Sequence, residues 1–194
     1  MQATHPGTLA GRLVGRSAAA TIAAVVGFAA LTAVLAQVRL YLPGNPVPIT
    51  GQTFAVLLAG AALGSWAGAG SQLLYVAVGM AGLPVFAGAN GGWTYATGAT
   101  FGYLAGFVAA AWLVGRLAEQ GQDRSVWTAI PAFLTGTAVI YTLGVVWLMW
   151  TVPGIDSIAR AVTVGVVPFL AGDALKIALA GVALPTAWRL TGGI

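Results

Sequence analysis

The stretch Pro168-Phe-Leu-Ala-Gly-Asp-Ala-Leu-Lys176 places an aspartate and a lysine inside an otherwise apolar segment. An ionised side chain in hydrocarbon costs roughly 2.5 to 3.5 kcal/mol on insertion scales, so such residues face a bundle interior or a cavity and have a partner. Asp173 and Lys176 are three residues apart and would share one face of a helix. The pair is therefore either an ion pair that holds helices together or part of a functional site that faces a cavity.

The composition of the whole chain is typical of an integral membrane protein. Hydrophobic residues make up 59% of the 194 residues, and the mean hydropathy is +0.91. Only 6% of residues are charged, compared with about a quarter in soluble domains. The net charge of +4 comes mainly from Arg residues at the ends of apolar segments. Because they do not gather on one face, nucleic-acid binding is not predicted.

Several classes of function lack the residues that they need. The chain has no cysteine, so a disulfide framework and a thiolate metal site are excluded, and its single histidine, His5, lies in a polar tail. No G-x-x-x-x-G-K-[ST] phosphate loop occurs, and the four carboxylates form no acid-base pair or nucleophile triad. The sequence therefore predicts no enzyme, no cofactor and no metal site. Uptake against a gradient would need energy from another subunit or a coupled ion.

Apolar windows predict an all-α bundle of six transmembrane helices in a single domain over residues 1–194. The spans are expected at about residues 17–38, 50–64, 67–82, 99–117, 126–151 and 162–188. The first apolar run is about 22 residues long, more than the 7 to 15 of a signal-peptide core, so it is interpreted as a helix that spans the membrane. The second and third spans are short, which leaves a four-span arrangement as an alternative.

The distribution of arginines predicts that both termini face the cytoplasm. With six spans in this orientation, five arginines lie inside and two outside. The inner ones are Arg12, Arg16, Arg116, Arg124 and Arg189, and the outer ones are Arg39 and Arg160. Such a protein would be a multi-pass protein of the cell membrane, in contact with the lipid bilayer.

Small residues recur at four-residue spacing, a pattern that lets helix backbones approach closely. Two rows consist of Gly60, Gly64 and Gly68 and of Gly98, Gly102 and Gly106. Ala29 and Ala33 form a similar stripe on the first span. That stripe could pack inside the bundle or dock on a partner protein.

The predicted topology directs polar groups of several spans toward Asp173 and Lys176. Gln52 opens the second span and Asn90 lies in an outer loop. Lys176 suits a carboxylate, ionised Asp173 can only accept hydrogen bonds and so suits an N–H group, and the two amides match an amide or urea edge. The sequence therefore predicts an outward-facing site for a small organic acid.

Aromatic residues near the outer ends of the spans could form the apolar walls of such a site. Phe86 precedes Asn90 in the outer loop, and Tyr103 lies at the start of the fourth span. An apolar pocket with a few placed polar groups is typical of a small-molecule site.

Four blocks of sequence resemble the BioY family, the biotin-binding S components of energy-coupling factor transporters. The blocks are Val47-Pro-Ile-Thr-Gly-Gln-Thr53 with Leu58-Ala-Gly-Ala-Ala-Leu-Gly64, Tyr75 with Gly79-Met-Ala-Gly-Leu-Pro-Val-Phe-Ala-Gly88, Gly102-Tyr-Leu-Ala-Gly-Phe107, and Gly172-Asp-Ala-Leu-Lys176. The resemblance implies a six-helix subunit of a prokaryotic plasma membrane that captures biotin from outside. A transmembrane coupling subunit and two ATP-binding cassette ATPases would supply the energy.

The resemblance also implies roles for individual residues. Biotin would bind Asp173, Lys176, Asn90 and Gln52. The stripe of Ala29 and Ala33 would contact the coupling subunit. The chain departs from the family in Gly98-Ala-Thr-Phe-Gly-Tyr103, where the family usually has a proline before the threonine and a glycine after it. This departure concerns the shape of the junction between loop and helix.

Two other functions are compatible with the same residues. The chain could be a structural membrane protein in which the Asp173–Lys176 pair locks helices together. It could also be a stand-alone secondary transporter for a vitamin.

Overall fold

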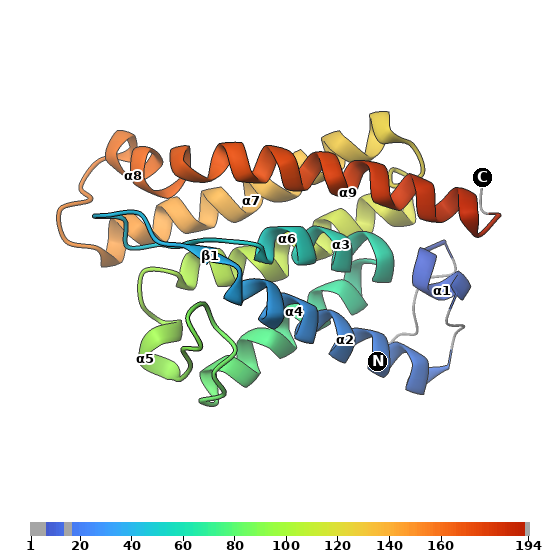
Figure 1. The fold of residues 1–194 in the computed structure, drawn as a ribbon, viewed down its shortest axis with the longest axis horizontal. Coiled ribbons are helices and arrows are strands. Elements are labelled where there is room, and N and C mark those ends of the chain that lie inside the picture. The colour runs from blue at the N-terminus through green and yellow to red at the C-terminus, as the bar shows by residue number, and fades with distance from the viewer. Residues whose placement is uncertain (1–6, 14–16, 193–194) are drawn as a thin grey trace.

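Helix α6, Phe101–Glu119, runs along the middle of an elongated helical bundle and packs against α3, α4 and α7 (Figure 1). The computed structural model describes residues 7–13 and 17–192. The helices are α1 Leu9–Leu13, α2 Ala18–Gln37, α3 Gln52–Leu63, α4 Ser65–Met80, α5 Trp93–Ala96, α6, α7 Val126–Thr151, α8 Ile158–Gly165, the 3-10 turn η1 Val167–Phe169 and α9 Leu170–Leu190, and the strands are β1 Arg39–Leu40 and β2 Ile49–Thr50.

The described residues form a helix within each of the six predicted spans. Within the described part of the chain, four helical stretches are long and apolar enough to cross a membrane, namely α2, α6, α7 and the run Ile158–Leu190. Their outer surfaces carry exposed apolar side chains such as Val34, Leu134 and Leu179. These surfaces support a mostly helical membrane protein, because lipid can surround apolar side chains whose exposure to water would be unfavourable.

Helix α3 is short because it lies inside the bundle. Its 12 residues are mostly buried, and α2, α4, α6 and α9 pack around it. At 1.5 Å per residue it is about 18 Å long, less than the roughly 30 Å of a hydrocarbon core. The N-terminal end of α3, with Gln52 and Thr53, is thereby held in the interior of the protein.

The predicted sixth span, about residues 162–188, is not one continuous helix in the structure. Helix α8 begins earlier, at Ile158, and the chain is interrupted at Val166–Phe169 before α9 begins at Leu170. Pro168 explains the break, since proline has no N–H for the helix ladder and restricts the residue before it. Asp173 therefore lies in the first turn of α9 rather than far along a helix.

The predicted loop between the first two spans contains a small strand pair, so the described chain is not helical throughout. Strands β1 and β2 are antiparallel, with Arg39 opposite Thr50. Asn45, in the turn between them, donates a hydrogen bond from Nδ2 to the carbonyl oxygen of Val164 in α8 at 3.0 Å. This contact fixes the hairpin against α8 and positions Thr50 at the start of α3.

Glycines of both predicted rows mark close helix crossings, although Gly98 lies in the turn before α6. A Cβ atom added at Gly60 would collide with the backbone of Ala111 in α6, and one added at Gly106 would meet the backbone of Ile140 in α7. Gly64 differs, because its φ of +86° ends α3 and allows the immediate turn into α4. These contacts set the backbone separations around the interior of the bundle.

Candidate ligand-binding site

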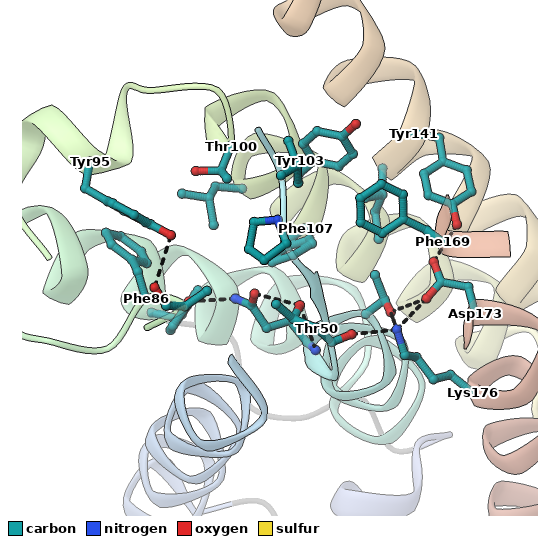
Figure 2. A pocket seen from close by; sticks show the side chains of 18 residues that line it. Thr50, Phe86, Tyr95, Thr100, Tyr103, Phe107, Tyr141, Phe169, Asp173 and Lys176 are labelled. Atoms are coloured by element: carbon teal, nitrogen blue, oxygen red, sulfur yellow. Dashed lines mark hydrogen bonds and ion pairs between the residues drawn. The ribbon is translucent and has the colours of Figure 1, made fainter. Parts of the chain in front are cut away.

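A cavity lies where β2 and the N-terminal ends of α3 and α9 meet α4, α5, α6 and α7. Figure 2 shows an aromatic side with Phe86 and Tyr95, and a polar side with Asp173 and Lys176 at the opposite end. Thr50 lies between the two sides. The cavity thus combines apolar walls with a few convergent polar groups, as small-molecule sites do.

Lys176 at the polar end uses all three of its N–H donors within the protein. Its Nζ lies 2.6 Å from the carbonyl oxygen of Thr50, 3.1 Å from Thr53 Oγ1 and 2.6 Å from Asp173 Oδ1. The lysine side chain is 17% exposed and that of Asp173 is 5% exposed. The expected partnership of the two charges is present, and it extends from α9 to β2 and α3.

The Asp173 carboxylate accepts hydrogen bonds at both oxygens. Thr53 Oγ1 donates to Oδ1 at 2.9 Å, next to the Lys176 contact, and the Tyr141 hydroxyl donates to Oδ2 at 2.6 Å. A carboxylate offers about four lone-pair sites. Among the described residues three are occupied, so one acceptor position remains on Oδ2. This end of the cavity can therefore accept one N–H or O–H group.

Gln52 and Tyr75 form a second buried polar contact at the cavity. Gln52 Nε2 donates to the Tyr75 hydroxyl at 2.6 Å, and its Oε1 accepts from Thr50 Oγ1 at 2.9 Å. The sequence prediction placed Gln52 at the site, and the structure places it in the cavity lining. Because its amide is anchored on both sides, its orientation is fixed.

Phe86 and Tyr103 line the cavity as apolar walls. The Phe86 ring stacks on Tyr95 with centroids 5.5 Å apart and meets Tyr75 edge to face at 5.5 Å. The Tyr103 hydroxyl donates to the carbonyl oxygen of Gly165 at 2.7 Å. Since that hydroxyl is bonded to the backbone of α8, Tyr103 presents chiefly its ring to the cavity.

Asn90 is the predicted site residue that does not line the cavity. Its side chain is exposed, and Nδ2 donates to the carbonyl oxygen of Ala87 at 2.8 Å. Its backbone forms a bridge with Phe86. In this structure Asn90 shapes the loop that carries Phe86, rather than facing the cavity directly.

Ala29 and Ala33 lie along an apolar groove between α2 and α4. Ala29 is buried, at 7% exposure, and Ala33 is partly buried. Gly27 and Ala30, which lie near this stripe on the same helix, are exposed. The predicted stripe thus forms the inner edge of the groove, while its neighbours form the outer face.

Sequence reasoning missed Thr53 and Tyr141, which complete the polar network. Thr53 follows Gln52 directly, and a hydroxyl in the first turn of a buried helix was a usable signal. Tyr141 is an aromatic residue inside the long apolar helix α7, where nothing in the local pattern separates it from packing residues. No cluster of three or more potential metal-ligating residues occurs in ranges 7–13 and 17–192.

Comparison with known proteins shows the family of this chain. The profile described as BioY family matches residues 8–193. The chain belongs to the BioY family. A relative named biotin transporter BioY from Thermotoga maritima is 39% identical over 153 residues, which cover 79% of this chain and 86% of the relative. A relative of the same name from Rhodobacter capsulatus is 39% identical over 167 residues, covering 82% and 88% of the two chains.

The fold of this BioY family member also matches a solved structure. That structure is the S-component for biotin from an ECF-type ABC transporter, with a TM-score of 0.78 at 24% sequence identity. The match covers 87% of this chain and 90% of the other. At this identity the likeness establishes the shared helical fold.

Proposed function

We propose that this chain is the biotin-binding subunit of an energy-coupling factor transporter, which captures biotin from outside a prokaryotic cell. The observation that carries the proposal is the cavity itself, where a network of Asp173, Lys176 and Thr53 faces aromatic walls. Membership of the BioY family and relatives named biotin transporters support the same ligand.

Biotin has the chemistry that this cavity is suited to receive. Its fused ring head is neutral and carries two ureido N–H groups, and one of them would donate to the remaining acceptor position on Asp173 Oδ2. The apolar part of the head would pack against Phe86 and Tyr103, with Gln52 at the edge of the cavity. Asn90 would act on biotin through the loop that carries Phe86, or directly if that loop rearranges when biotin binds.

Lys176 has two possible roles toward the ligand. It could serve as the counter-ion of the biotin carboxylate, but it would then have to exchange an existing hydrogen bond for the new one. Alternatively it stays in its network and neutralises Asp173, which then accepts the ureido N–H. The short contacts of Lys176 to Thr50 and Asp173 favour the second role.

The wider assembly follows from the same proposal. The chain would cross the membrane six times as one domain, with both termini in the cytoplasm, and α3 would form a short inner span. A transmembrane coupling subunit and two ATP-binding cassette ATPases would supply the energy. The coupling subunit would dock on α2 along the Ala29 and Ala33 groove, which lies on the outside of the bundle.

Isothermal titration of the purified protein in detergent with biotin tests the proposed ligand. We expect saturable binding of one biotin per chain, and no binding of thiamine or riboflavin at the same concentrations. Binding of another vitamin in place of biotin would end the proposal. Uptake by cells with and without the coupling subunit and ATPases tests the assembly, since a stand-alone secondary transporter would work without them.

One observation favours a second function, a purely structural role for the charged pair. Lys176 and Asp173 connect α9 with α3 and α7 through hydrogen bonds to Thr53 and Tyr141. The combined replacement Asp173→Asn and Lys176→Gln separates the two functions. A structural role predicts that biotin uptake survives in whatever protein still folds, whereas the binding role predicts that uptake is lost.

A further inference from the structure

Among the described residues, the hydroxyl of Tyr141 makes the one hydrogen bond that Asp173 accepts from α7. It donates to Asp173 Oδ2 at 2.6 Å, while the two other donors, Thr53 and Lys176, both reach Oδ1. In Figure 2 Tyr141 approaches the carboxylate from the side opposite Lys176. The carboxylate is thus held by Tyr141 on one oxygen and by Thr53 and Lys176 on the other. Rotation about its Cβ–Cγ bond would break hydrogen bonds at both oxygens.

Tyr141 also forms part of the wall that encloses the cavity. The same side chain lines the cavity and an open apolar groove between α7 and α8, which Val145 and Val162 also line. Its ring lies 6.5 Å from that of Phe169, with the planes tilted by 47°. The ring therefore separates the cavity from the groove, and the hydroxyl at its end bonds the carboxylate.

We infer that Tyr141 is a positioning residue that gives the site its selectivity for a ligand with an N–H group. Its hydrogen bond occupies one lone pair of Oδ2 and leaves the other directed at a fixed point of the cavity. A fixed acceptor favours an N–H at that point and disfavours a ligand that carries a methyl group there, because the methyl group would occupy the place of the donor and leave the acceptor buried without a hydrogen bond. The inference rests on the proposed function, since it requires that biotin is the ligand.

Tyr141→Phe isolates this effect, because the variant keeps the ring that closes the wall and loses only the hydroxyl. Biotin and two analogues, each methylated at one ureido nitrogen, are titrated into wild type and variant. In wild type we expect one of the two methyl isomers to bind at least about tenfold more weakly than biotin. In Tyr141→Phe biotin should lose about tenfold in affinity, and the gap between biotin and that isomer should shrink to about twofold.

Tyr103→Phe is the matched control for loss of a buried hydroxyl next to the cavity. The Tyr103 hydroxyl bonds the Gly165 carbonyl and not Asp173. This change should alter the affinities for biotin and for the methyl isomers by the same factor. The ratio of those affinities should therefore keep its wild-type value. A melting temperature for each variant shows whether a hydroxyl acts only on stability.

A double-mutant cycle with Asp173→Asn tests whether Tyr141 acts through the carboxylate. In that background Tyr141→Phe should change biotin affinity by less than about twofold, because the acceptor that the hydroxyl orients is already altered. The inference would be overturned if Tyr141→Phe left the ratio of the affinities for biotin and the methyl isomer unchanged. It would also be overturned if Tyr141→Phe lowered biotin affinity by a full factor of about ten in the Asp173→Asn background. Failure of wild type to bind biotin at all would instead refute the proposed function, and the inference with it.

Discussion

Asp173 Oδ1 and Lys176 Nζ lie 2.6 Å apart at the start of α9, with Asp173 in the first helical turn. A carboxylate near a helix N-terminus is favoured by the helix dipole. The lysine one turn later is held by Thr50 and Thr53 as well. The two charges therefore neutralise each other within a segment that is otherwise apolar.

Removing one partner of this pair should cost more stability than removing both. We expect Lys176→Met to destabilise the protein by about 3 kcal/mol, since breaking a buried pair leaves a charge without compensation. Combining it with Asp173→Asn should recover part of the loss. Thermal unfolding in detergent measures both. A double variant less stable than Lys176→Met would contradict the account of the two residues as a mutually neutralised pair.

The carboxylate of biotin should contribute little through Lys176. All three donors of the lysine are engaged, so a ligand carboxylate would replace a hydrogen bond rather than add one. We expect biotin and its carboxamide to bind wild type within about threefold of each other. Titration calorimetry compares them directly. A loss of about 100-fold for the amide, abolished in Lys176→Met, would show that the lysine leaves its network to bind the carboxylate.

Gly60 should tolerate no side chain, because α3 and α6 touch there. A Cβ at this position would lie 2.5 Å from the Ala111 carbonyl oxygen, so Gly60→Ala should cost about 1 to 3 kcal/mol. Gly70 on α4 is the matched control, since a Cβ there would have no neighbour within 4 Å. Gly70→Ala should leave the melting temperature equal or slightly higher, as alanine favours a helix by about 1 kcal/mol. Equal losses at the two positions would refute the close crossing.

Asp123, in the turn between α6 and α7, should make stability depend on pH. It is 2% exposed, and burial raises the pKa of its carboxyl above the ordinary 3.8, although a hydrogen bond from Trp188 Nε1 at 2.6 Å opposes the shift. A raised folded-state pKa gives stability that is present below the unfolded pKa and is lost as pH rises through the folded value.

Comparison with Asp123→Asn, which cannot ionise, measures this contribution separately from other titrating groups. The melting temperature of wild type minus that of the variant should be largest near pH 4 and decrease toward neutral pH. The asparagine oxygen can still accept from Trp188, so the contact itself is retained. A difference that grows toward neutral pH would mean that the buried carboxylate is favoured in the charged form.

The sequence by itself determined the helical membrane class and most of the helices. Apolar length and composition located α2 and α7 to within one residue of their observed ends, since a bilayer constrains how long an apolar helix must be. The charged pair could also be found without a structure. Asp173 and Lys176 stand out because a charge in an apolar segment is costly unless it faces a partner or a cavity. The rows that contain Gly60 and Gly106 predicted close helix crossings.

Only the tertiary structure decided which groups surround that pair. Residues far apart in the chain meet there, Thr50 from the hairpin, Thr53 from α3 and Tyr141 from α7. Periodicity describes one helix face at a time and cannot say which faces meet. The break at Pro168 moved Asp173 to a helix start, and loop packing turned Asn90 away from the cavity. The sequence thus identifies the charges, and the fold determines how many hydrogen bonds they have left for a ligand.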